Sequence, residues 1–309
     1  MTISDTPLVP TATDEGQHSP QDVPHWSESW YFDAVSDDRT IGVYTRLGRV
    51  PARGTALYSA AIVMPGGSTF MLVDPAADLP DDPGQTVTTD RFHADQLCVE
   101  PLQSFRVRLR GTAAAHADHA APLRAEDGTD VDVELDLVWE TDGTPYRWQL
   151  TDRYEIPCRV TGTVRIGDTV HEFAGPGQRD HSWGPRDWWG HEWMWSAFHL
   201  EDGTRTHAVV IDDLPGLMIG YAQQAGELTE LTSGSYAAEP DADGLVRSDE
   251  LVLADAGLTL SVRPTGFGPL RLVSDEGRVA FFTRAMAEVT TDDGRRGVGW
   301  IEWNRVQPD

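Results

Sequence analysis

The sequence contains no lysine, so all 24 of its basic residues are arginine. This absence excludes chemistry that needs a lysine amine, such as Schiff-base aldol reactions, pyridoxal-phosphate anchoring and P-loop or kinase phosphoryl transfer. Basic residues are also few, since 50 acidic residues give the 309-residue chain a formal net charge of −26. We therefore expect neither nucleic acid nor an anionic membrane surface as a partner, because both bind basic faces.

Cysteines and long apolar runs are equally scarce. Cys98 and Cys158 are the only cysteines; they are too few for a disulfide scaffold and are not spaced like metal ligands. No apolar run approaches the ~20 residues that span a bilayer, and residues 1–20 carry no basic and apolar secretion signal. These features predict a cytoplasmic protein without membrane insertion, and they give no indication of its oligomeric state.

The remaining sequence is a succession of short β-prone runs separated by glycine- and proline-containing turns. Residues 131–137 (VDVELDL) alternate between apolar and acidic side chains, as a half-buried strand does, and Pro65, Gly66 and Gly67 mark a hairpin between two such runs. No long amphipathic helix is visible. The pattern predicts an all-β chain of sandwiches or barrels rather than an α/β fold.

The domain organisation is less sharply marked, because strands and tight turns alternate along the whole chain. Residues 1–20 are polar and aperiodic, which predicts a mobile tail. We expect an N-terminal β-domain over residues 21–170 and a C-terminal β-domain over residues 171–309. The glycine- and proline-rich stretch near residues 170–190 is the best candidate for the link between them.

One segment, residues 175–199 (GPGQRDHSWGPRDWWGHEWMWSAFH), combines many indole rings with many charges. Exposing so many tryptophans is costly, and a plain core strand would not carry this density of ionisable groups. The combination indicates a cavity with aromatic walls and a few ionisable groups at one end. The alternative is a structural plug between two domains, in which indoles stack on arginines and Arg–Asp pairs satisfy one another.

The string G-x-G-x-R-D-H-S-W-G-x-R-D-W in this segment resembles the carotenoid hydratase (hydroxyneurosporene synthase) family and its lipocalin-like relatives, which include fungal decalin-forming Diels–Alderases. Residues 25–51 and 297–306 resemble the first and last strands of an actinobacterial branch of that superfamily. The resemblance implies two lipocalin-like β-domains with a hydrophobic pocket near their junction. It also implies reactions on terpenoid or polyketide substrates without a redox cofactor. Carried over by position, the motif residues are Arg179, Asp180, His181, Trp183, Gly184, Arg186 and Trp188.

Hydration or cyclisation of an alkene needs a proton donor and a way to stabilise a cation. A carboxyl group in an apolar pocket has a raised pKa and can donate a proton near neutrality, and indole faces attract cations. Neighbouring strand residues point to opposite faces, so only one of His181 and Asp180 reaches the cavity; we prefer His181 as the acid–base group, with Asp180 as the alternative. Glu302 is a further candidate carboxylate. The expected substrate-binding residues are Trp183, Trp188, Trp189, Trp193, Trp195, Arg179, Arg186 and Trp303.

These residues predict a cofactor-independent enzyme that hydrates, cyclises or isomerises a small hydrophobic molecule by acid–base chemistry. Two alternatives remain open: a lipocalin-like carrier of a similar ligand, and a structural or interaction module in which the tryptophans only pack two domains together. We expect no cofactor and no metal. His191, His199 and His207 share one face of a continuous strand, but the turn at residues 201–203 interrupts it, so a metal site there is not favoured.

Overall fold

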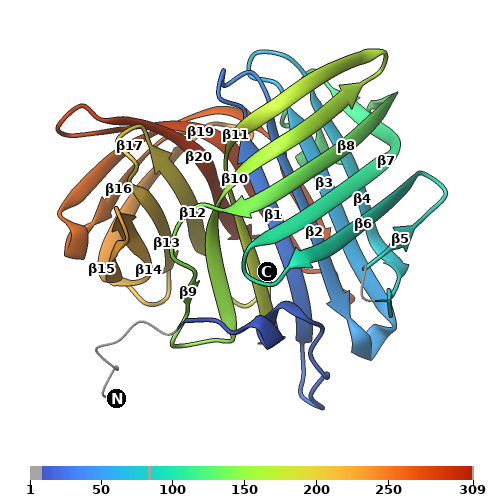
Figure 1. Cartoon of the computed structure of the whole chain (residues 1–309). Coiled ribbons are helices and arrows are strands. Elements are labelled where there is room, and N and C mark those ends of the chain that lie inside the picture. Colours follow the sequence, from blue (N-terminus) through green and yellow to red (C-terminus); the bar gives the residue numbers. More distant parts are fainter. Residues whose placement is uncertain (1–8, 83–84, 308–309) are drawn as a thin grey trace.

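The computed structural model describes residues 9–82 and 85–307, and antiparallel strands make up nearly all of the regular structure in them (Figure 1). The strands form two separate sheets that lie side by side, the first blue to green and the second yellow to red in Figure 1. Each sheet curls back on itself. The expected all-β fold of two lipocalin-like units is confirmed.

The first sheet closes into a barrel in the order β4-β3-β2-β1-β11-β10-β8-β7, because β7 also pairs with β4. Two further strands, β6 and β5, extend the sheet beyond β7, and β9 pairs with β10. The strands of this sheet are β1 (Trp26–Val35), β2 (Gly42–Val50), β3 (Thr55–Val63), β4 (Thr69–Asp78), β5 (Val87–Thr88), β6 (Phe92–Glu100), β7 (Ser104–His116), β8 (Thr129–Thr141), β9 (Tyr146–Arg147), β10 (Arg153–Ile166) and β11 (Thr169–Pro185).

The second sheet closes in the order β17-β16-β15-β14-β13-β12-β20-β19, through the pairing of β17 with β19, and β18 adds to β19. Its strands are β12 (Trp193–Leu200), β13 (Arg205–Ile211), β14 (Leu217–Gln224), β15 (Glu227–Pro240), β16 (Val246–Leu253), β17 (Leu258–Phe267), β18 (Leu270–Val273), β19 (Val279–Thr291) and β20 (Arg296–Val306). Short 3-10 turns complete the regular structure: η1 (Ala12–Glu15), η2 (Pro51–Arg53), η3 (Ala121–Arg124) and η4 (Ala254–Ala256). In the described part of the chain no helix is long and apolar enough to cross a bilayer.

Three apolar clusters follow from this architecture, one inside each barrel and one between the barrels. The alternation predicted for residues 131–137 is present: Val133, Leu135 and Leu137 are buried in the first barrel. The cluster between the barrels joins them directly, since the indole Nε1 of Trp300 on β20 donates to the Ala34 carbonyl of β1 at 3.0 Å. The two barrels thus share a packed boundary.

The chain passes from the first sheet to the second between Pro185 and Trp193. The expected border at residues 170/171 instead falls in the hairpin between β10 and β11, because the glycine-rich stretch is a close-packed strand. A Cβ on Gly175 would lie 1.8 Å from the Val35 carbonyl oxygen of neighbouring β1. The glycine and proline content that resembles a link therefore reflects how near β1 approaches.

The expected mobile tail also differs from the structure. Residues 1–8 lie outside the described residues, but residues 9–20 are ordered along the first barrel, and η1 buries Asp14 and Glu15. The Glu15 carboxylate accepts hydrogen bonds from both terminal nitrogens of Arg179, at 2.8 and 3.1 Å. A guanidinium buried in a barrel needs a counter-ion, and this segment supplies it.

A candidate active site between the two barrels

A cavity of about 360 Å³ lies between the barrels and takes side chains from both sheets. Strands β1, β2, β3, β10 and β11 contribute from the first sheet, and β12, β13, β18, β19 and β20 from the second. Most of the wall is aromatic or aliphatic, which is typical of a site for a small organic molecule. The principal apolar groups are Trp188, Trp193, Trp195, Leu270, Leu272 and Phe282.

Asp180 lines this cavity together with Arg46, Arg153 and Arg186, whose charges act on it, and we call this charged group the polar end of the cavity. It stands on β11 directly across from Glu155 of β10, and Arg153 bridges the two carboxylates. Nη2 of Arg153 donates to Asp180 Oδ2 at 2.7 Å, and its Nε donates to Glu155 Oε1 at 2.7 Å. The carboxylate of Glu155 is further held by Gln178 Nε2 at 2.9 Å and by the indole of Trp195 at 3.3 Å. Asp180, which lines the cavity, is thus linked through Arg153 to the fully buried Glu155.

Burial and the neighbouring Glu155 raise the pKa of Asp180 to about 7, against the opposing charges of Arg153, Arg186 and Arg46. Burial also raises the pKa of Glu155, which Arg153 and its other donors counteract. Near neutral pH, Asp180 therefore exists in both protonated and ionised forms. Such a group can give a proton to a bound molecule or take one from it.

Glu302 lines the cavity from the second barrel, as the sequence predicts for a candidate carboxylate. It forms an ion pair with Arg284 across the β19–β20 pair and accepts a hydrogen bond from the Trp193 indole at 3.2 Å. The Arg284 guanidinium lies over the rings of Tyr31 and Tyr44, 4.9 and 4.4 Å from their centroids. Glu302 thus has its own counter-ion, separate from the Arg153 that pairs with Asp180.

His181 faces away from this cavity, into the first barrel. Its Nδ1 lies 2.7 Å from the Asp14 carbonyl oxygen and its Nε2 3.1 Å from Glu28 Oε1, and its ring stacks on Trp30 with centroids 4.2 Å apart. The alternation of Asp180 and His181 is as expected from a strand, but the orientation is the reverse of our preference. Asp180, the alternative, is the residue that reaches the cavity.

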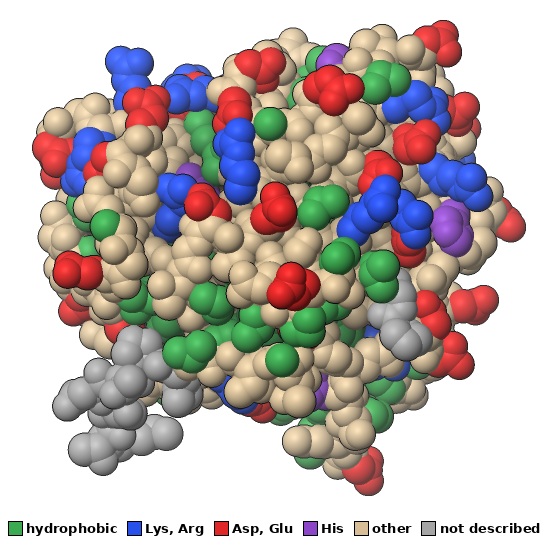
Figure 2. All heavy atoms as spheres, in the orientation of Figure 1, with side chains coloured by type: hydrophobic (Ala, Val, Ile, Leu, Met, Phe, Trp, Pro, Cys, Tyr) green, Lys and Arg blue, Asp and Glu red, His purple; other side chains and the backbone are tan. Residues whose placement is uncertain are grey.

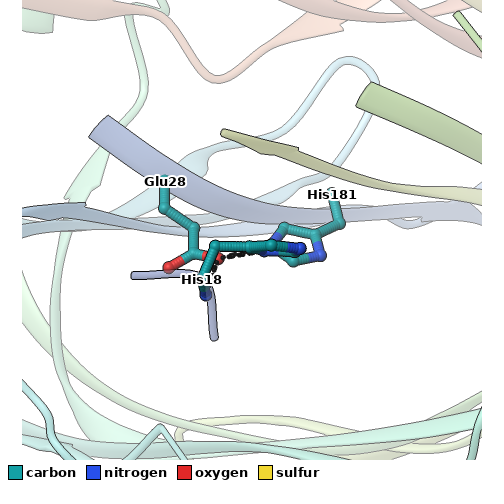
Figure 3. Close-up of side chains that lie close together, drawn as sticks. All are labelled: His18, Glu28 and His181. Atoms are coloured by element: carbon teal, nitrogen blue, oxygen red, sulfur yellow. Dashed lines mark hydrogen bonds and ion pairs between the residues drawn. The ribbon is translucent and has the colours of Figure 1, made fainter. Parts of the chain in front are cut away.

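Figure 3 shows that His18, Glu28 and His181 point toward one another. Their donor atoms lie within 4.8 Å of one another, so together they are a ligand set able to hold a metal ion. Glu28 Oε1 accepts from His18 Nδ1 at 2.9 Å, and Oε2 accepts from Arg49 at 2.9 Å. Burial raises the pKa of Glu28, but the hydrogen bonds from both histidines outweigh it and lower that pKa to about 2. In this hydrogen-bonded form, the cluster fastens the N-terminal segment to β1 and β11.

The expected substrate-binding residues fall into separate groups. Those that line the cavity are Trp188, Trp193, Trp195 and Arg186. Those that lie elsewhere are Arg179 and Trp183, in the first barrel; Trp303, in the second; and Trp189, which packs against the cluster between the barrels.

Each residue outside the cavity has a structural partner. Trp183 stacks on His18 with centroids 3.8 Å apart, and the Trp303 indole donates to Asp249 Oδ2 at 2.9 Å. Trp189 packs beside Trp188, with ring centroids 6.2 Å apart. Some tryptophans of the segment thus line the cavity and others pack around it. The segment combines the two alternatives from the sequence, a cavity wall and a structural plug.

Sequence reasoning missed several cavity residues, above all Arg46, Arg153 and Arg284. None of them lies in the tryptophan-rich segment, and they reach the cavity only because β2, β10 and β19 are brought beside it. The one available signal was local: Arg153 and Glu155 are two residues apart and so share a face of their strand.

Comparison with solved structures supports the fold. An AttH candidate from Nitrosomonas europaea is 16% identical with a TM-score of 0.65, over 98% of this chain and 98% of that chain. Kievitone hydratase from Nectria haematococca is 11% identical with a TM-score of 0.61, over 96% and 92%. CghA with Sch210972 is 13% identical with a TM-score of 0.55, over 99% and 96%. At these identities, the likeness is one of fold.

The search of curated proteins gives no match. A sequence family does match, and it extends from residue 11, in the segment that carries Glu15 and His18, to residue 307, directly after β20. The match spans both barrels, so the pair of barrels is the unit of the family. The chain belongs to the family described as Domain of unknown function (DUF7064).

Proposed function

We propose that this protein is an enzyme that uses Asp180 as an acid–base group on a small, largely hydrophobic molecule held between the two barrels. The reaction is an acid–base-assisted hydration, cyclisation or isomerisation. The observation that carries the proposal is the position of Asp180: a buried carboxyl with a pKa of about 7, at the polar end of a cavity with indole walls.

The arrangement supports proton transfer to carbon in a specific way. Protonated Asp180 supplies the proton, and Arg153, hydrogen-bonded to its Oδ2, stabilises the carboxylate that remains. The faces of Trp188, Trp193 and Trp195 offer cation–π stabilisation to positive charge that develops on the substrate. The same walls limit the access of water to a reactive intermediate.

The structural neighbours support an enzymatic role. Kievitone hydratase is a hydratase by name, and CghA was crystallised with Sch210972. Both share the two-barrel fold with this chain. The terpenoid or polyketide class of the substrate follows from the resemblance alone and is part of the proposal.

A non-catalytic carrier of a hydrophobic ligand is the second candidate. The preponderance of apolar side chains in the cavity wall favours it. The two candidates differ in what Asp180 does, because a carrier needs no proton transfer.

Solvent deuterium incorporation separates these functions. Purified protein is incubated in D₂O with a panel of prenylated phenols and polyenes, and products and recovered substrates are analysed by mass spectrometry. We expect a panel member to gain carbon-bound deuterium with the wild-type protein, and we expect Asp180→Asn to lower that rate at least about 100-fold. Binding of the same compound, measured by calorimetry, should remain within about threefold.

Glu276→Gln is the matched control, since Glu276 is exposed, on the turn before β19, and is not among the residues that line the cavity. It should leave both incorporation and binding unchanged. Binding without incorporation across the panel would establish the carrier. Incorporation by Asp180→Asn at the wild-type rate would refute the role given to Asp180.

A further inference from the structure

Most arginine side chains in this protein are paired with a carboxylate. The chain holds 50 acidic residues for 24 arginines, and acidic and basic side chains lie intermixed over the upper part of the face in Figure 2. Most guanidiniums have a carboxylate within ion-pair distance. Among residues 9–82 and 85–307, no carboxylate or hydrogen-bond acceptor lies within bonding distance of the guanidiniums of Arg46, Arg110, Arg186, Arg271 and Arg296.

These five unpaired arginines differ in their surroundings. Arg110, Arg271 and Arg296 are exposed, so water satisfies their donors. Arg46 and Arg186 are half-buried, and both line the cavity between the barrels. The shielded guanidiniums that lack an acceptor are thus concentrated at one place, beside Asp180.

Arg46 is held in position although it has no acceptor. Its guanidinium carbon lies 4.4 Å from the centroid of the Trp188 ring, which leaves the edge of the planar group free to donate hydrogen bonds. Arg186 follows directly after β11, and its backbone N–H is fixed by the His25 carbonyl at 2.9 Å. The Arg46 guanidinium and the Arg186 backbone are therefore held in place, and both guanidiniums line the cavity with donors available to a bound molecule.

The other charged groups in the cavity wall have partners of opposite sign. After these pairings, the guanidinium charges of Arg46 and Arg186 remain without a carboxylate partner in the cavity wall. The pairs are Arg153 with Asp180 and Glu155, Arg284 with Glu302, Asp187 with Arg278, and His191 with Asp213.

The unbalanced charge also appears in the arginines themselves. Burial first, and then the charges of Arg153 and Arg46, lower the pKa of Arg186 to about 9. Burial, and then Arg284, lowers the pKa of Arg46 to about 10. An anion bound between the two guanidiniums would remove this destabilisation.

We propose that the substrate carries one planar oxyanion, a carboxylate or an acidic enolate, and that Arg46 and Arg186 bind it at the polar end of the cavity. Guanidinium groups match planar oxyanions by paired hydrogen bonds. The apolar remainder of the molecule then lies along the indole and leucine wall. This inference rests on the proposed function, because the proposed function identifies the cavity as the substrate site. An oxyanion bound by the two arginines would place the reacting bond nearby, within reach of Asp180.

The test compares two probes that differ in charge but hardly in shape. They are 1-naphthaleneacetate and its neutral analogue 2-(1-naphthyl)ethanol, and binding of each is measured by isothermal titration calorimetry at pH 7. We expect the carboxylate to bind at least about tenfold more tightly than the alcohol. Higher ionic strength should weaken the binding of the carboxylate and leave the binding of the alcohol unchanged.

Variants assign the preference to the two arginines. Arg186→Gln and Arg46→Gln should each weaken the binding of 1-naphthaleneacetate by about tenfold and have little effect on the binding of the alcohol. Arg110→Gln removes the same charge from an unpaired, exposed arginine on β7 and should change neither affinity. Because the Arg186 side chain forms no ion pair or hydrogen bond with the described residues, its replacement should leave the circular dichroism spectrum and the unfolding midpoint unchanged.

The outcomes separate the two proposals. Equal affinity for both probes, or a carboxylate preference that survives in Arg186→Gln and Arg46→Gln, overturns the oxyanion site while the cavity remains a ligand site. Binding of neither probe overturns the cavity as a ligand site, and with it both proposals.

Discussion

The ion pair between Glu15 and Arg179 determines how firmly the N-terminal segment is held, and Glu15→Gln tests it. Both side chains are buried, 3% and 2% exposed. The Glu15 carboxylate also accepts from the Tyr154 hydroxyl and from the Leu102 N–H, each at 2.8 Å. A glutamine amide would turn an NH₂ group toward donors and would leave the Arg179 charge without a counter-ion.

The magnitude follows from what happens to that charge. Removing one partner of a buried pair in a rigid core costs about 3–5 kcal/mol. Here the segment around Glu15 can detach and admit water to Arg179, which limits the loss. We therefore expect the free energy of unfolding to fall by about 3 kcal/mol, at the lower end of that range.

Urea unfolding followed by circular dichroism at pH 7 measures this loss. The exposed Glu276→Gln should change the free energy of unfolding by no more than about 0.5 kcal/mol. Limited proteolysis should cut the Glu15→Gln protein within residues 9–20 faster than the wild type. A loss below about 1 kcal/mol, with unchanged proteolysis, would refute the view that this segment completes the barrel.

The same pair predicts a dependence on pH. Burial raises the pKa of Glu15, but Arg179 and the hydrogen bonds outweigh it, so the pKa lies below its ordinary value of 4.5. A lowered folded-state pKa gives stability that is complete above pH 4.5 and is lost as the pH falls through the lower value. The difference between wild type and Glu15→Gln should therefore shrink below pH 4.5.

Three further predictions follow from other parts of the fold. Because the pKa of Asp180 is about 7, 1-naphthaleneacetate should bind more weakly as the pH rises through 7, and calorimetry should find no such change in Asp180→Asn. Trp303→Phe removes the indole donor to Asp249 inside the second barrel; urea unfolding should show a loss of about 2–3 kcal/mol with unchanged probe affinity. Gly175→Ala places a Cβ 1.8 Å from the Val35 oxygen, so we expect it to cost more than about 3 kcal/mol, or to be insoluble on expression.

The fold could be predicted because its signals are local. Alternation in residues 131–137 and turn residues such as Gly66 act over a few positions, and the strands they predict are present. The border at 170/171 was misplaced because a glycine in a link and a glycine under a neighbouring strand look alike in a sequence. The difference lies in Val35, which contacts Gly175 only after folding.

The site could be predicted only in part. The motif identified Asp180, and strand geometry stated that Asp180 and His181 diverge, but the choice between faces depends on Glu28 and on the carbonyl of Asp14, both remote in sequence. Likewise, the interpretation of Arg179 as substrate-binding failed to allow for Glu15, in a segment whose polarity resembles that of a free tail. Long-range pairing decides such roles, and one sequence does not contain it.

The shared boundary between the two barrels has a consequence for how this protein can change. A ligand in the proposed site would contact both barrels at once, so neither barrel expressed alone would offer more than an open aromatic surface. A change in ligand selectivity during evolution would then require substitutions in both barrels together. A small rotation of one barrel against the other would likewise change the shape of the cavity without unfolding either barrel.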